Sequence, residues 1–169
     1  MAAHMQQLSP DRSFTLIERR ADLGGTWDLF RYPGIRSDSD MHTLGFSFEP
    51  WTHEKAIADG PSILDYLNMI TAKYDLAKDM QFGRKVVSAE WDSKTACWSV
   101  TSQGSDGSAQ LLRGRFLFLG SGYYDYDEPY DAQLPGRDSF GGELIHPQFW
   151  PKDFDATGKR IVVIGSGAT

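Results

Sequence analysis

The stretch Arg160-Ile-Val-Val-Ile-Gly165-Ser-Gly167-Ala-Thr169 decides the fold class, because it places an apolar, β-branched run directly before a Gly-x-Gly turn. In dinucleotide-binding proteins such a run is a buried strand, and the glycines after it let backbone N–H groups approach a pyrophosphate. We therefore predict a strand over residues 160–164 and a phosphate-binding role for Gly165, Ser166, Gly167, Ala168 and Thr169. By itself a Gly-x-Gly turn is a weak signal, since it can also simply reverse a chain.

A second motif lies just upstream, in Phe140-Gly-Gly142-Glu-Leu-Ile-His146-Pro-Gln-Phe-Trp150-Pro151. Its pattern F-x-G-x-x-x-H-x-x-x-W-P resembles the signature of the Baeyer-Villiger monooxygenases, flavin enzymes that insert one oxygen atom of O2 beside a carbonyl or onto a heteroatom. The resemblance implies that the motif lies where two domains meet and that His146 serves catalysis. The alternative is a buried histidine bonded to backbone, with Trp150 and Pro151 as an aromatic plug and a turn.

The segment from Gly24 to Asp40 is rich in turn-forming residues and is predicted to be a long ordered loop, which in a compact domain usually has a function. The alternative is a surface loop without a function. Its G-G-T-W and R-Y-P-G-I-R-S-D stretches also resemble the same family. The resemblance implies an FAD cradle made of Gly25, Thr26, Trp27, Asp28 and Leu29, and an approach to NADPH by Arg36, Ser37 and Asp38. Asp38 would lie beside the flavin ring and orient a catalytic arginine of the second nucleotide domain; otherwise it is an N-cap for residue 39 onward.

The remaining elements complete an α/β pattern. Residues 13–18 read as a buried strand, and Glu18 at its end stands where dinucleotide folds place a ribose-binding acid, although a solvated strand-end acid is the alternative. Apolar residues at helical spacing predict an amphipathic helix over residues 60–74. A β-meander is predicted from residues 80–82, 85–91, 97–101 and 111–119. In the family one backbone group of such a meander contacts the flavin adenine, and the matching residue here is Val86. The alternative is that Val86 is an ordinary core residue of the strand.

Composition excludes several classes of protein. A content of 40% apolar and 13% aromatic residues excludes a disordered chain, and 17 basic against 23 acidic residues disfavours a nucleic-acid partner. The single cysteine, Cys97, permits no internal disulfide, excludes a redox cysteine pair and indicates a structural strand position in a reducing, cytoplasmic protein. We predict no transmembrane segment and no metal site.

The resulting prediction is a truncated, three-layer, FAD-binding Rossmann-like domain with an inserted β-meander over residues 1–138. A linker over 139–158 follows, and 159–169 begin an NADPH-binding domain. The implied function is FAD- and NADPH-dependent monooxygenation of a ketone, sulfide or thioamide by O2. The alternatives are a nitrogen- or sulfur-oxidising enzyme of the sister group, which typically lacks the W-P ending, and a non-catalytic remnant or binding module. We expect the 169-residue chain by itself to bind FAD poorly and to be inactive.

Overall fold

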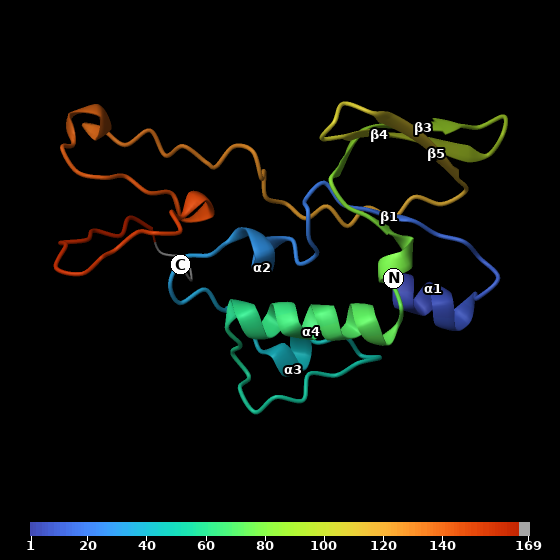
Figure 1. Cartoon of the computed structure of the whole chain (residues 1–169), viewed down its shortest axis with the longest axis horizontal. Coiled ribbons are helices and arrows are strands. Elements are labelled where there is room, and N and C mark those ends of the chain that lie inside the picture. Colours follow the sequence, from blue (N-terminus) through green and yellow to red (C-terminus); the bar gives the residue numbers. More distant parts are fainter. Residues whose placement is uncertain (166–169) are drawn as a thin grey trace. The chain divides into compact units, whose positions relative to one another are not determined.

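The computed structural model describes residues 1–165 and divides the chain into two compact units (Figure 1). Unit 1 consists of Met1–Gly25 and Leu67–Gly122; unit 2 consists of Thr26–Tyr66 and the chain from Tyr123 onward. The helix α4, Gly60–Lys73, begins in unit 2 and ends in unit 1. Within the described part of the chain, no helix is long and apolar enough to cross a membrane.

Unit 1 opens with α1, Ala2–Leu8, and contains a short parallel sheet. In this sheet β1, Leu16–Ile17, pairs with β2, Met80–Gln81, which follows the single-turn helix η1, Ala77–Asp79. The predicted strand over 13–18 is therefore confirmed near its C-terminal end. Residues 80–82 were expected in the meander, and that prediction is wrong, because Met80 and Gln81 pair with β1 instead.

The second sheet of unit 1 is an antiparallel meander of β3, Arg84–Asp92, β4, Cys97–Gly104, and β5, Ala109–Gly114. Asp92 closes the first turn by accepting hydrogen bonds from Lys94 N at 2.8 Å and Thr95 Oγ1 at 2.8 Å. A β-bulge interrupts the pairing between Val86 and Ser88. Cys97 starts β4 as predicted, and its Sγ donates to the Gly114 carbonyl oxygen at 3.5 Å.

One predicted strand, over residues 111–119, is shorter than expected, and the one over residues 160–164 is not formed. β5 ends at Gly114, and residues 116–119 are irregular, with Phe116 88% exposed. Residues 160–164 are also irregular, with Val162 84% exposed. A strand needs the backbone groups of a neighbour, and nothing within residues 1–165 pairs with either run. Apolar composition alone was therefore not sufficient evidence for a strand.

Unit 2 is mostly loop, as predicted for residues 24–40, with the short helices α2, Thr26–Leu29, and α3, Met41–Leu44 (Figure 1). Between Tyr123 and the last described residue, 165, its regular structure consists of the single turns η2, Arg137–Ser139, and η3, Pro147–Phe149. The core of unit 2 surrounds the start of α4 and contains Met41, Trp51, Ala58, Ile63 and Tyr66. The buried positions Ile63, Tyr66 and Ile70 recur at helical spacing and confirm the amphipathic helix.

Asp59, immediately before α4, stabilises the first turn of this helix. Its Oδ1 accepts hydrogen bonds from Ser62 N at 2.9 Å and Ser62 Oγ at 2.7 Å. The backbone bond is the largest cause that lowers the pKa of Asp59, followed by the hydroxyl. Both bonds favour the ionised carboxylate, as a cap at a helix N-terminus does.

We expect Asp59→Ala to destabilise the chain by about 1 kcal/mol near neutral pH. Because the folded-state pKa of Asp59 is lowered, its contribution is complete above the unfolded-state pKa of about 3.9. It is lost as the pH falls through the folded-state pKa. Urea unfolding of both proteins between pH 7 and pH 3 measures this; a difference that already shrinks between pH 7 and pH 5 would contradict it.

Candidate functional site

In unit 1 the structure brings Glu18 and the start of the meander together. The Glu18 backbone donates to Gln81 O and accepts from Arg84 N, both at 2.9 Å, so β3 begins beside the end of β1. Oε1 of Glu18 accepts from Arg20 N at 2.8 Å, which fixes the carboxylate at the strand end. Val86 lies two residues into β3 and is 45% exposed, so the alternative of a plain core residue is wrong.

The loop that enters unit 2 begins with two glycines in conformations that other residues avoid. Gly24 has a φ of 114° and Gly25 a φ of 53°. α2 follows directly, and its Asp28 is buried, 9% exposed. Arg31 Nη2 donates to Asp28 Oδ1 at 2.8 Å, and Arg31 Nε donates to the Asp28 carbonyl oxygen at 3.0 Å. The Asp28 carboxylate therefore stabilises its own turn.

Ser37 anchors the part of the loop that carries Arg36 and Asp38. Its backbone N–H donates to Ala58 O at 2.8 Å, and its Oγ accepts from Ala58 N at 3.1 Å. Ser37 is 1% exposed, whereas Arg36 and Asp38 are exposed. Arg36 also forms an antiparallel bridge with Asp59. Arg36 and Asp38 therefore flank the anchored Ser37 as exposed residues.

We expect Ser37→Ala to destabilise the chain by about 1–3 kcal/mol, because it leaves the buried Ala58 N–H without its acceptor. Ser39→Ala is the matched control; Ser39 is exposed, and its Oγ donates to Asp38 Oδ1 at 3.3 Å. Surface changes of this kind usually stay within about 0.5 kcal/mol. Equal urea midpoints for the two variants would show that Ser37 does not anchor the loop.

The predicted alternative role of Asp38 as a helix cap is wrong. Asp40, two residues later, is the N-cap of α3, and its Oδ1 accepts from His42 N at 2.7 Å. The helix starts at Met41, because Met41 is the first residue there that buries an apolar side chain. Asp38 thus has no capping role that would account for its carboxylate.

An aromatic cluster lies beside this loop. The rings of Phe30 and Tyr32 meet edge to face at 6.1 Å, and those of Phe30 and Tyr124 at 5.3 Å. Tyr123 lies 4.5 Å from Tyr124, ring centre to ring centre. The hydrogen bond with Tyr123 is the main cause that raises the pKa of Tyr124, followed by burial and the charges of Tyr123, Tyr32 and Asp38. Asp38 therefore belongs to the electrostatic surroundings of the cluster.

Part of the signature motif forms the turn η3. His146 is exposed, so the alternative of a buried histidine is wrong, although its Nδ1 does accept a backbone bond, from Gln148 N at 3.2 Å. Gln148 is buried, and its Nε2 donates to the Asp125 carbonyl oxygen at 2.8 Å. Trp150 packs edge to face on Phe154 at 5.3 Å, as an aromatic plug would. The hydrogen bonds of the described residues do not join His146 to Asp38.

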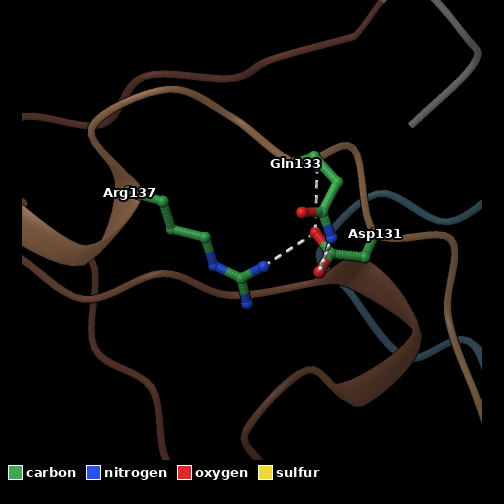
Figure 2. A network of polar contacts seen from close by, with 3 residues as sticks. All are labelled: Asp131, Gln133 and Arg137. Carbon is green, nitrogen blue, oxygen red and sulfur yellow. Dashed lines mark hydrogen bonds and ion pairs between the residues drawn. The ribbon is translucent and has the colours of Figure 1, made fainter.

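The segment over residues 131–137, before the motif, contains a small polar network (Figure 2). Asp131 accepts from Arg137 Nη1 at 2.7 Å and from Gln133 Nε2 at 2.8 Å. All of these side chains are exposed, so the network contributes little free energy of folding and mainly shapes the turn. Of the predicted phosphate-binding residues, Gly165 has a φ of 146°. Ser166, Gly167, Ala168 and Thr169 lie outside the described residues.

Comparison with known proteins identifies the family. Residues 46–169, which include the α4 helix, the meander and the signature motif, match the flavin-binding monooxygenase-like family. The chain belongs to the flavin-binding monooxygenase-like family. The FAD-containing monooxygenase EthA of Mycolicibacterium smegmatis is 51% identical over 168 residues, which cover 99% of this chain and 34% of EthA. The probable FAD-binding monooxygenase AlmA of Acinetobacter baylyi is 46% identical, over 100% of this chain and 34% of AlmA.

Solved structures agree with the family assignment. An oxidised steroid monooxygenase bound to NADP superposes with a TM-score of 0.79 at 30% identity, covering 98% of this chain and 32% of that enzyme. An open cyclohexanone monooxygenase gives 0.78 at 31% identity, covering 99% and 33%. The α/β, FAD-binding Rossmann-like class expected for the chain is thereby confirmed. The chain spans about a third of the length of these relatives.

Sequence reasoning missed three residues that hold the site: Ser37 as an anchor, Asp40 as a cap and Gln148 as a buried donor. Asp40 had a detectable signal, because an Asp directly before an apolar residue is a common helix start. The other two carry no local signal, since their partners are distant in sequence.

Proposed function

We propose that the chain supplies the flavin side of an FAD- and NADPH-dependent monooxygenase of the Baeyer-Villiger type. Such an enzyme inserts one atom of O2 into a small ketone or onto the sulfur of a sulfide or thioamide. Bound FAD would supply the redox chemistry that links NADPH to O2. A cytoplasmic location belongs to the same proposal and rests on the use of a single cysteine.

The residues present fit FAD. The Glu18 carboxylate, at the end of a parallel strand, is proposed to accept hydrogen bonds from the adenosine ribose, and the exposed Val86 backbone to contact the adenine. The glycine pair, Gly24 and Gly25, lets backbone approach a flat ring without a Cβ between them. Thr26, Trp27, Asp28 and Leu29 complete the proposed cradle.

The observation that carries the proposal is the anchored Ser37 between the exposed Arg36 and Asp38. Ser37 is fixed by Ala58, so the backbone that carries the exposed Arg36 and Asp38 is held in place. We assign Arg36, Ser37 and Asp38 to NADPH, with Asp38 beside the reacting ring, and Gly165–Thr169 to the NADPH pyrophosphate. Fixed charges near a reaction centre are a large source of rate acceleration.

A chimera tests the proposal, in which this chain replaces the corresponding third of M. smegmatis EthA. The chimera should convert a cyclic ketone to its lactone and a thioether to its sulfoxide, both with NADPH and O2, as measured by gas chromatography. Sulfoxide without any lactone would favour the sister-group enzyme. A chimera that retains FAD but forms neither product would support the non-catalytic alternative.

In this chimera we expect His146→Ala to lower product formation while FAD stays bound, because His146 sets the turn η3 of the motif. A loss of roughly tenfold or more corresponds to about 1.4 kcal/mol of transition-state stabilisation. Phe149→Leu, at a half-exposed neighbour, is the control and should change the rate little. Equal rates for His146→Ala and wild type would exclude a catalytic role of the histidine.

A further inference from the structure

Gln148 stands out in the signature segment because it is 6% exposed while Phe149 beside it is 50% exposed. Burying an amide without hydrogen-bond partners costs free energy of folding, so a buried amide normally has a partner. The partner of Gln148 shows which segment this side chain holds. Its Nε2 donates at 2.8 Å to the carbonyl oxygen of Asp125, 23 residues earlier. This hydrogen bond ties η3 to the connector that begins at Tyr123.

Hydrogen bonds hold Asp125 in place within the segment that begins at Tyr123. Its Oδ1 accepts hydrogen bonds from Asp127 N at 2.8 Å and Glu128 N at 3.2 Å, which close a turn. With its carbonyl held by Gln148 and its carboxylate by the turn, the residue has little freedom to move. Tyr124, directly before it, therefore has a defined position.

Tyr124 contacts the loop that begins at Thr26. Its ring meets Phe30 edge to face at 5.3 Å, and Phe30 directly follows α2, donating its backbone N–H to Thr26 O at 3.0 Å. Phe30 in turn contacts Tyr32. Aromatic pairs of this geometry contribute about 0.5–1.5 kcal/mol beyond their buried area, enough to hold a loop with little regular structure.

We infer that Gln148 is a positioning residue: by holding the Asp125 carbonyl it keeps Tyr124 packed on Phe30, and this contact fixes the start of the loop, from Thr26 to Tyr32. The importance of this loop for cofactor binding rests on the proposed function, but the coupling itself does not. The connection runs from the signature motif to the loop through residues of unit 2 alone. Gln148 falls on a variable position of the signature pattern, so the motif itself assigns it no role.

The test uses the 169-residue chain with ring-13C tyrosine, and its NMR signals are assigned by replacing Tyr32, Tyr66 and Tyr124 one at a time by Phe. Gln148→Asn shortens the amide so that it no longer reaches Asp125. Gln133→Asn is the matched control, because it makes the same change in the exposed Asp131 network (Figure 2). Gln148→Leu is a second variant that keeps the bulk and loses the donor.

Both Gln148 variants should move the Tyr124 and Tyr32 signals toward those of free tyrosine and leave Tyr66 in place, since its hydroxyl bonds to Phe46 N in the core of unit 2. Gln133→Asn should move none of the three. An unchanged Tyr124 signal would overturn the inference. A shift of Tyr66 as well would also overturn it, because Gln148 would then merely support the folding of unit 2. Activity of the chimera is a separate measurement, so failure of the proposed function is distinguishable.

Discussion

Asp38→Ala is expected to lower NADPH-dependent oxygenation by the chimera by on the order of a hundredfold or more while FAD stays bound. Asp38 is exposed beside the anchored Ser37 and has no capping role, so its carboxylate is available to hold a cation where negative charge develops. Turnover and retained flavin are measured on one preparation.

Asp40→Ala is the matched control, since it removes the same side chain two residues away. It should cost about 1 kcal/mol of stability, because Asp40 caps α3, and change turnover little. Unchanged turnover of Asp38→Ala, or a loss equal to that of Asp40→Ala, would remove Asp38 from the chemistry.

Trp51→Ala is expected to destabilise the chain by about 3–5 kcal/mol, the usual cost of deleting a buried aromatic side chain. Trp51 is 4% exposed, meets Tyr66 edge to face at 5.4 Å, and donates from Nε1 to Lys55 O at 3.0 Å. Its segment connects α3 to Ala58, the partner of Ser37, so unfolding there also releases the loop of Arg36 and Asp38. Urea unfolding monitored by circular dichroism gives the free energy.

Trp51→Phe separates packing from hydrogen bonding, because it keeps a ring and loses the Nε1 donor. It should cost clearly less than Trp51→Ala. An alanine variant within about 0.5 kcal/mol of wild type, the range of ordinary surface substitutions, would show that the segment is not part of the core.

Sequence periodicity predicted those elements that are held by local contacts. The helix over residues 60–74 and the β3–β4–β5 meander were found because helical spacing and turn residues such as Asp92 are local signals. The runs at 116–119 and 160–164 were wrongly predicted as strands because pairing depends on a partner that no local pattern reveals. Residues 80–82 were assigned to the wrong sheet for the same reason.

Local signals correctly placed Glu18 at a strand end and the two glycines before α2, while the binding roles of these residues stay predictions. The residues that hold the loop in place could not be predicted. Ser37 depends on Ala58, and Gln148 on Asp125, and both partners are defined only by the folded chain. The cap assigned to Asp38 belongs to Asp40, because burial of Met41 sets where the helix starts.

Anaerobic reduction of the purified chimera tests the central claim most directly. If this chain is the flavin side of a monooxygenase, the chimera should carry FAD in a one-to-one ratio. NADPH should bleach the visible flavin band in the absence of O2, and admitting O2 with a ketone or thioether should restore the band with formation of product. A chimera that folds, as shown by a cooperative unfolding transition, but is purified without flavin would contradict the account.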